Sequence, residues 1–107
     1  MGFFKNLLRV YTARIGNASG SDFNRCYVAT AKKDGLPALL IWGFGKKDYV
    51  FNKNDIKEAN LISGGAGYNF GGQIRVANKY RIVFNDGKSV ILDIPVASSS
   101  KIERIIY

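Results

Sequence analysis

The segment most suggestive of chemistry is the glycine-rich stretch at residues 63–72, SGGAGYNFGG. A P-loop needs GxxxxGK followed by Ser or Thr, because the lysine and the hydroxyl handle phosphate and magnesium. Gln73 stands where that lysine would be, and the dinucleotide spacing GxGxxG fails because its third glycine would fall at Phe70. The stretch is therefore expected to be a mobile loop or a hairpin tip, with a binding loop around Tyr68 and Phe70 as the functional alternative.

Acid–base and metal chemistry find little support. The chain has no histidine, which is the commonest general base and the commonest transition-metal ligand. Cys26 lies in a strand-like run, so a buried inert thiol is favoured over a nucleophile. Five aspartates stand at expected turns, where their side chains bond local backbone, and Asp93 has Lys79 as its expected partner. We therefore expect no catalytic residue, no metal site and no cofactor, and the protein is not expected to be an enzyme.

Basic residues are the remaining candidates for binding. Sixteen Lys and Arg against eight Asp and Glu give a formal net charge of +8, which favours acidic partners such as nucleic acid, anionic lipid or an acidic protein surface. Two lysine pairs stand at expected turns and would share one end of the sheet if their hairpins lie side by side. Lysines at sheet ends also block edge-to-edge association, which is the alternative. Arginine beside two aromatic residues would suit the stacking of single-stranded nucleic acid. The candidate binding residues are Lys32, Lys33, Lys46, Lys47, Tyr68, Phe70 and Arg75.

The element that organises the chain is a hairpin at residues 79–94, KYRIVFNDGKSVILDI. The sequence Asn-Asp-Gly between two apolar runs is a turn signal. A three-residue loop sets Ile82 opposite Val90 and places Gly87 at a left-handed position, whereas a two-residue loop would divide the apolar side chains between two faces. We therefore predict the three-residue loop, with Lys79 opposite Asp93 on the outer side. The shared apolar face is then Tyr80, Ile82, Phe84, Val90, Leu92 and Ile94.

Further strands are expected on both sides of short turns. Residues 38–44 are apolar on both faces, which is typical of an interior strand. Residues 55–62 fit a helix or a strand, and the strand is favoured because the neighbouring elements are strands. A break is expected at Asn78. The seven expected strands are residues 25–31, 38–44, 49–51, 55–62, 73–77, 79–84 and 88–94.

Two helices are expected at the ends of the chain. Residues 1–15 carry apolar side chains at spacings of three and four, with basic residues on the other side, so an amphipathic helix is predicted. It would cover the core or pair with a second copy in a homodimer, or else rest on an anionic membrane surface. Residues 16–24 are polar and small and are predicted to be a linker loop. Residues 95–107 are predicted to form a closing helix that buries Ile102, Ile105 and Ile106.

These expectations define one α+β domain over residues 1–107, mainly an antiparallel β-barrel or sandwich. The 47% apolar content is that of a chain with a packed core. Residues 25–94 form the β-sheet body between the two terminal helices. No apolar run approaches the roughly 18 residues of a membrane span. The single cysteine excludes an internal disulfide and suits a reducing compartment, so a cytoplasmic location is expected.

The order of seven strands followed by a helix resembles the pleckstrin-homology-like superfold over residues 25–107, particularly its small stand-alone bacterial members. The late strand–Asp-Gly–strand–helix unit carries most of the likeness. The closing helix lacks the tryptophan usual in eukaryotic members, and residues 38–44 contain no basic residue, so the phosphoinositide-binding pattern is absent. The resemblance implies a closed or half-closed barrel used for contact with proteins or membrane surfaces.

The expected function is therefore non-catalytic binding of a protein partner or an anionic surface. The alternative is a single-stranded nucleic-acid binder on an oligonucleotide-binding-type barrel, and an enzyme ranks third. Fold alone does not decide between them.

Overall fold

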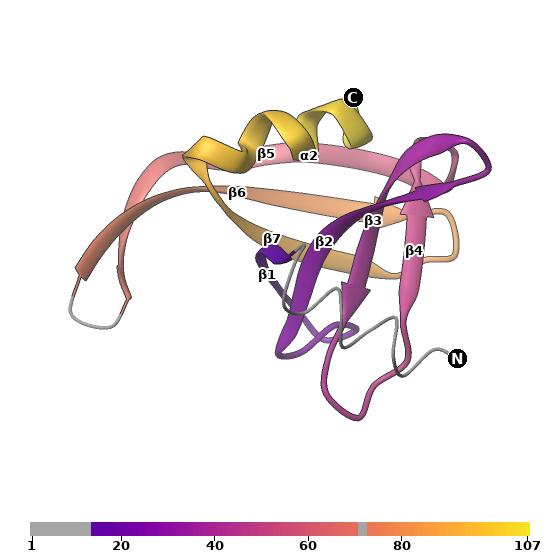
Figure 1. Ribbon diagram of the computed structural model, residues 1–107, viewed down its shortest axis with the longest axis horizontal. Helices are drawn as coiled ribbons and strands as arrows, with labels where there is room; N and C mark the ends of the chain where they lie inside the picture. Colours follow the sequence, from indigo (N-terminus) through magenta and orange to yellow (C-terminus); the bar gives the residue numbers. More distant parts are fainter. Residues whose placement is uncertain (1–13, 71–72) are drawn as a thin grey trace.

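A computed structural model describes residues 14–70 and 73–107, with backbone alone for residues 65–70 and 73–75. The described chain forms one curled antiparallel sheet of seven strands in the order β4-β3-β2-β1-β7-β6-β5, and a C-terminal helix packs against it (Figure 1). The elements are β1 (Arg14–Ser19), β2 (Cys26–Lys33), β3 (Leu36–Trp42), β4 (Tyr49–Asn52), a 3-10 turn (Lys53–Asp55), β5 (Ile56–Phe70), β6 (Gln73–Phe84), β7 (Ser89–Pro95), a second 3-10 turn (Val96–Ser98) and α2 (Ser99–Ile106).

The core lies inside the curl of the sheet. Because side chains alternate along a strand, each of β2, β3, β6 and β7 sends every second residue inward. Leu39 and Ile41 from β3 thus join one buried cluster with Ile82 from β6 and Leu92 from β7. The half-barrel architecture confirms the mainly antiparallel part of the predicted fold.

Helix α2 closes part of this core, as predicted. Ile102, Ile105 and Ile106 are buried and belong to the same cluster. The hydroxyl of Tyr80 on β6 donates to a carboxylate oxygen of Glu103 at 3.1 Å, which adds a polar tie between the helix and the sheet. The amphipathic spacing in this short segment was therefore a sufficient signal for both the helix and its buried face.

The hairpin between β6 and β7 has the predicted three-residue loop. Ile82 pairs with Val90, and Lys79 pairs with Asp93, whose charged groups lie 3.7 Å apart. At the turn, the Gly87 N–H donates to the Phe84 carbonyl at 3.0 Å, and Gly87 has a φ of 92°. All six side chains of the predicted apolar face are at most 1% exposed. The turn chemistry and the alternation therefore specified the same register.

The predicted linker is wrong for residues 16–19. Arg14–Ser19 is strand β1, which pairs with β2 on one side and β7 on the other and so joins the two halves of the sheet. The predicted helix over residues 1–15 is wrong for residues 14 and 15, and its remainder lies outside the described residues. Position 16 has no room for a side chain, because a Cβ at Gly16 would lie 2.5 Å from the Asp93 carbonyl oxygen. A small, polar composition thus marked close strand packing and not a flexible loop.

Of the two predictions for the glycine-rich stretch, the loop is wrong and the hairpin is confirmed. Strand β5 continues to Phe70, β6 begins at Gln73, and the expected break at Asn78 is absent because β6 is continuous. Within residues 55–62, the strand begins at Ile56, which confirms the strand that was predicted there in preference to a helix. The distal halves of β5 and β6 form an arm that projects beyond the body at the left of Figure 1. Seven strands were predicted and seven are found, but β1 replaces one that results from splitting β6.

Candidate binding groove

The two predicted lysine pairs lie at opposite ends of the sheet. Lys32 and Lys33 end β2, where Lys33 pairs with Leu36 across the β2–β3 hairpin. Lys46 and Lys47 lie between β3 and β4, beyond the far end of β3. Successive connections of antiparallel strands alternate between the two ends of a sheet. The lysine pairs therefore do not form the shared patch expected from the sequence.

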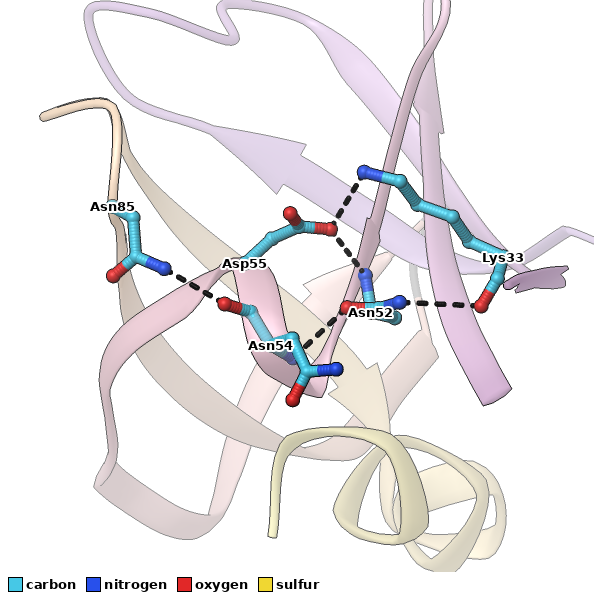
Figure 2. A network of polar contacts seen from close by, with 5 residues as sticks. All are labelled: Lys33, Asn52, Asn54, Asp55 and Asn85. Carbon is cyan, nitrogen blue, oxygen red and sulfur yellow. Dashed lines mark hydrogen bonds and ion pairs between the residues drawn. The ribbon is translucent and has the colours of Figure 1, made fainter. Parts of the chain in front are cut away.

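Lys33 belongs to a polar network that joins three connections (Figure 2). Its ammonium group lies 2.8 Å from Asp55 Oδ2, and the same oxygen accepts the Asn52 backbone N–H at 2.9 Å. The hydrogen bond from Lys33 lowers the pKa of the Asp55 carboxyl below its ordinary value, against a smaller opposing effect of burial. Lys33 is thus engaged within the fold.

The network extends to the β6–β7 turn through Asn85. The Asn85 side chain donates to the Asn54 carbonyl at 2.7 Å, and its backbone N–H donates to the Asp55 carbonyl at 2.9 Å. Asn52 caps the 3-10 turn by accepting the Asn54 N–H at 2.9 Å. We call these five residues, Lys33, Asn52, Asn54, Asp55 and Asn85, the polar latch, because they hold the β4–β5 connection against the ends of two hairpins. Its arrangement indicates a structural role and not a binding site.

The three other candidate residues lie on the arm. Tyr68 is the register partner of Arg75, and Phe70 is the partner of Gln73. Their side chains lie outside the described set. The backbone therefore brings Tyr68 and Arg75 to neighbouring positions, on a part of the sheet that contains neither lysine pair.

An open groove of about 500 Å³ lies beside β1 and the start of β2, where no site was predicted. Arg14, Arg25 and Tyr27 line it, together with two asparagines and Asp93. The Arg14 guanidinium stacks over the Tyr27 ring at 4.2 Å from the centroid and donates to Asn17 Oδ1 at 2.8 Å. Arg14 is thus held in place by an aromatic face and an amide oxygen.

Arg25 approaches the groove from the turn that precedes β2. Its φ is 56°, a left-handed conformation that is uncommon for a residue with a side chain. Lys46 adds a third positive charge, since its ammonium group donates to the carbonyl of Asn24, a residue of the groove wall. Phe44, 73% exposed, packs edge-on against Tyr27 with ring centroids 6.3 Å apart. We call Arg14, Arg25, Tyr27, Phe44 and Lys46 the basic groove.

Cys26 also lines the groove but is not set up as a nucleophile. Burial raises the pKa of its thiol above the ordinary value, and the positive charge of Lys46 offsets only part of that effect. A protonated thiol is a poor nucleophile. The groove therefore offers binding groups and no reactive one.

Of the groove residues, only Lys46 was singled out from the sequence. Arg14 was assigned to a helix and Arg25 to the start of a strand, with nothing to connect them. Both line the groove because β1 pairs with β2, in a register that sets Ala18 opposite Cys26. The one available signal was Arg-Cys-Tyr after a polar stretch, which is too short to specify a site.

No protein-family model, curated protein or solved structure matches this chain. Within residues 14–70 and 73–107, no three His, Cys, Asp or Glu residues gather in a way that would hold a metal ion. None of the helices that the structure describes is long and apolar enough to cross a membrane.

Proposed function

We propose that the protein is a non-catalytic binding module that takes an acidic segment of a protein partner in the basic groove. The observation that carries this proposal is that cationic side chains from three separate segments lie at one groove: Arg14 and Arg25 line it, and Lys46 donates to the Asn24 carbonyl in its wall. Arg14 begins β1, Arg25 precedes β2, and Lys46 follows β3. Such a cluster recognises carboxylates by charge-assisted hydrogen bonds, and the planar guanidinium fork suits their geometry.

The charges of the groove are available to a ligand. The ion pairs among the described residues join Lys33 to Asp55, Lys79 to Asp93, and Lys88 to Asp86, and none of them involves Arg14 or Arg25. The one acidic group in the groove wall, Asp93, is engaged by Lys79 at 3.7 Å. The local balance therefore favours an anionic ligand.

The shape of the fold also supports a binding module. The curled sheet of seven strands with one C-terminal helix is the kind of half-closed barrel that the pleckstrin-homology-like resemblance implies. Membership of that superfold remains a prediction. A groove with aromatic walls favours an extended peptide that carries carboxylates and an apolar side chain over a flat lipid surface.

The test is the binding of a fluorescein-labelled Asp/Glu-rich peptide, followed by anisotropy at low and physiological salt. The double variant Arg14→Gln/Arg25→Asn removes both guanidinium groups, and Asn tolerates the left-handed backbone at position 25. Each charge-assisted hydrogen bond contributes about 1.5–3 kcal/mol, so affinity should fall more than about tenfold.

The matched control is Lys32→Gln/Lys101→Gln, which removes the same charge at two exposed positions outside the groove. Its affinity should stay near that of the wild type, apart from a modest loss of long-range attraction. Equal losses in the two double variants would show that only net charge matters, and the groove proposal would then be wrong. Binding to phosphatidylserine vesicles without binding to the peptide would assign the groove to a membrane surface instead.

A second candidate function is single-stranded nucleic-acid binding on the arm, favoured by the register that makes Tyr68 and Arg75 partners. Aromatic stacking contributes about 1–3 kcal/mol per base, and phosphate contacts make the affinity fall steeply with salt. Oligonucleotide titrations with Tyr68→Ala and Phe70→Ala test it. Affinity unchanged by both substitutions would leave only bulk charge, and absence of binding at low salt would remove this candidate.

A further inference from the structure

The part of the sheet formed by β2, β3 and β4 is apolar on both faces. Its inner face belongs to the core, through residues such as Val28, Leu39 and Ile41. Its outer face carries a separate buried cluster of Ala29, Leu40 and Trp42. We call this second cluster, with the adjoining Tyr27, Ala31 and Val50, the outer patch.

The outer patch needs a cover. Its apolar neighbours among the described residues, Tyr27, Ala31 and Val50, all come from the strands that form the patch itself. An antiparallel sheet that faces water on one side normally alternates apolar and polar residues. A face that instead presents Trp, Tyr, Leu and Val marks a surface against which something packs.

Trp42 adds a polar requirement to this apolar surface. The side chain is 2% exposed, and its indole Nε1 is buried without a hydrogen-bond partner in the described part of the chain. Buried indole N–H groups normally find an acceptor. The occupant of the patch must therefore combine apolar side chains with an oxygen that reaches Trp42.

The chain itself leads to this surface. Arg14, the first described residue, pairs with Ala29, a member of the outer patch. Its guanidinium stacks on Tyr27, another member. Residues 1–13 therefore join the fold at the border of the patch, and even as a helix at about 1.5 Å per residue they would be long enough to cross three strands spaced about 4.8 Å apart.

The composition of residues 1–13, MGFFKNLLRVYTA, matches what the patch requires. Phe3, Phe4, Leu7, Leu8 and Tyr11 recur at intervals that gather them on one side of the segment. Asn6, Tyr11 and the backbone carbonyls offer acceptors for an indole N–H. The segment is also joined to the patch covalently, so its effective concentration there is far above that of a second molecule.

We propose that residues 1–13 fold back over the outer patch of their own chain, bury Trp42 and accept its indole N–H. This inference does not rest on the proposed function. Because Tyr27 belongs to both the outer patch and the basic groove, the docked segment would border the groove.

Trp42 is the single tryptophan of the chain, so its fluorescence reports directly on the cover. The test compares full-length wild type with the double variant Leu7→Asp/Leu8→Asp. The control is the double variant Lys5→Gln/Arg9→Gln, which changes the charge by the same amount on the polar side of the segment. The leucine variant should shift Trp42 emission to longer wavelength and raise acrylamide quenching toward that of free tryptophan. The control should match wild type, with circular dichroism verifying the fold of each protein. Unchanged emission and quenching in the folded leucine variant would overturn the proposal.

A measurement on the wild type keeps the proposal testable if the leucine variant unfolds. Nuclear Overhauser contacts between the Trp42 indole and the methyl groups of Leu7 or Leu8 are expected in isotope-labelled full-length protein. Contacts that appear only between labelled and unlabelled molecules would show that a second copy covers the patch, and the proposal would be wrong. Absence of any such contact, or protection of Trp42 only in the presence of anionic vesicles, would also overturn it.

Discussion

The single strand β6 takes part in two hairpins that are built differently. Toward its C-terminal end it pairs with β7, and Tyr80, Ile82 and Phe84 are buried in the core. Toward its N-terminal end it pairs with β5 in the arm, where Val76 is 51% exposed. The ladder of strand pairs nevertheless runs along both halves.

The difference shows that a strand needs a partner strand more than it needs a core. In the β6–β7 hairpin, alternating apolar side chains and the turn both indicate a strand. In the arm, glycines replace those side chains and the backbone ladder remains. Strand propensity largely measures how well a side chain fits a half-buried sheet. It therefore does not predict a strand where the side chains are small, as in the glycine-rich stretch.

The largest expected effect compares one side chain from each half of β6. Ile82 has no exposed surface, so Ile82→Ala should lower the free energy of unfolding by about 2–5 kcal/mol. Val76→Ala, at a position 51% exposed, should cost no more than about 0.5 kcal/mol. Urea denaturation of both variants measures the difference. Similar losses at the two positions would mean that the arm is as tightly packed as the core hairpin.

A glycine in the body and a glycine in the arm provide a second, smaller contrast. A Cβ at Gly16 would come within 2.5 Å of the Asp93 carbonyl oxygen and 2.6 Å of Ile94 Cδ1, so Gly16→Ala should cost about 1–3 kcal/mol by overpacking. A Cβ at Gly64 would have no neighbour closer than 3.6 Å, so Gly64→Ala should be neutral or raise stability by up to about 1 kcal/mol.

Thermal unfolding of these two glycine variants tests whether β1 is an integral strand. A neutral Gly16→Ala would contradict the close contact between β1 and β7, and with it the assignment of residues 14–19 to the sheet. A destabilising Gly64→Ala would show that the arm is more crowded than its backbone indicates.

The smallest expected effect concerns the polar latch, which ties the β6–β7 turn to the rest of the body. Asp55 has a lowered pKa because it accepts a hydrogen bond from Lys33, so the unfolded chain takes up a proton at a higher pH than the folded one. The stabilisation is present above the unfolded pKa of about 3.9 and is lost as the pH falls through the lower folded pKa.

We therefore expect wild type to be modestly more stable than Asp55→Asn at neutral pH, and this advantage to disappear as the pH falls below about 4. The matched control is Asp86→Asn, on an exposed turn where Asp86 lies 3.5 Å from Lys88. Denaturation midpoints of wild type and both variants, measured from pH 3 to pH 7, test whether the stability difference depends on pH. A stability difference that does not change with pH would show that the Asp55 carboxylate charge contributes nothing to the latch.

Much of the local structure could be predicted from the sequence. The register of residues 79–94 followed from a turn signal and two alternating runs within one short stretch, and the buried face of α2 followed from three isoleucines. The prediction of a strand over residues 55–62 was also confirmed from Ile56 onward. In each case the evidence was local, because the interacting residues were close in sequence or on one face of a single element.

The candidate site was largely beyond prediction. Lys46 was singled out, but Arg14 and Arg25 were not, because they come to line one groove only when β1 pairs with β2. The lysine pairs were expected together and lie at opposite ends, since the direction of each connection depends on the order of the strands in the sheet.

By itself the sequence determined a basic chain with one strongly patterned hairpin, a closing amphipathic helix and alternating strands around an apolar core. Only the tertiary structure decided that Arg14–Ser19 is a strand between β2 and β7 and that the glycine-rich stretch continues β5. It also decided that Arg14, Arg25 and Lys46 lie at one groove. The physical reason is the same throughout. Pairing between strands distant in sequence depends on backbone hydrogen bonds, which every residue can accept and every residue except proline can donate, so composition does not encode which strands will pair.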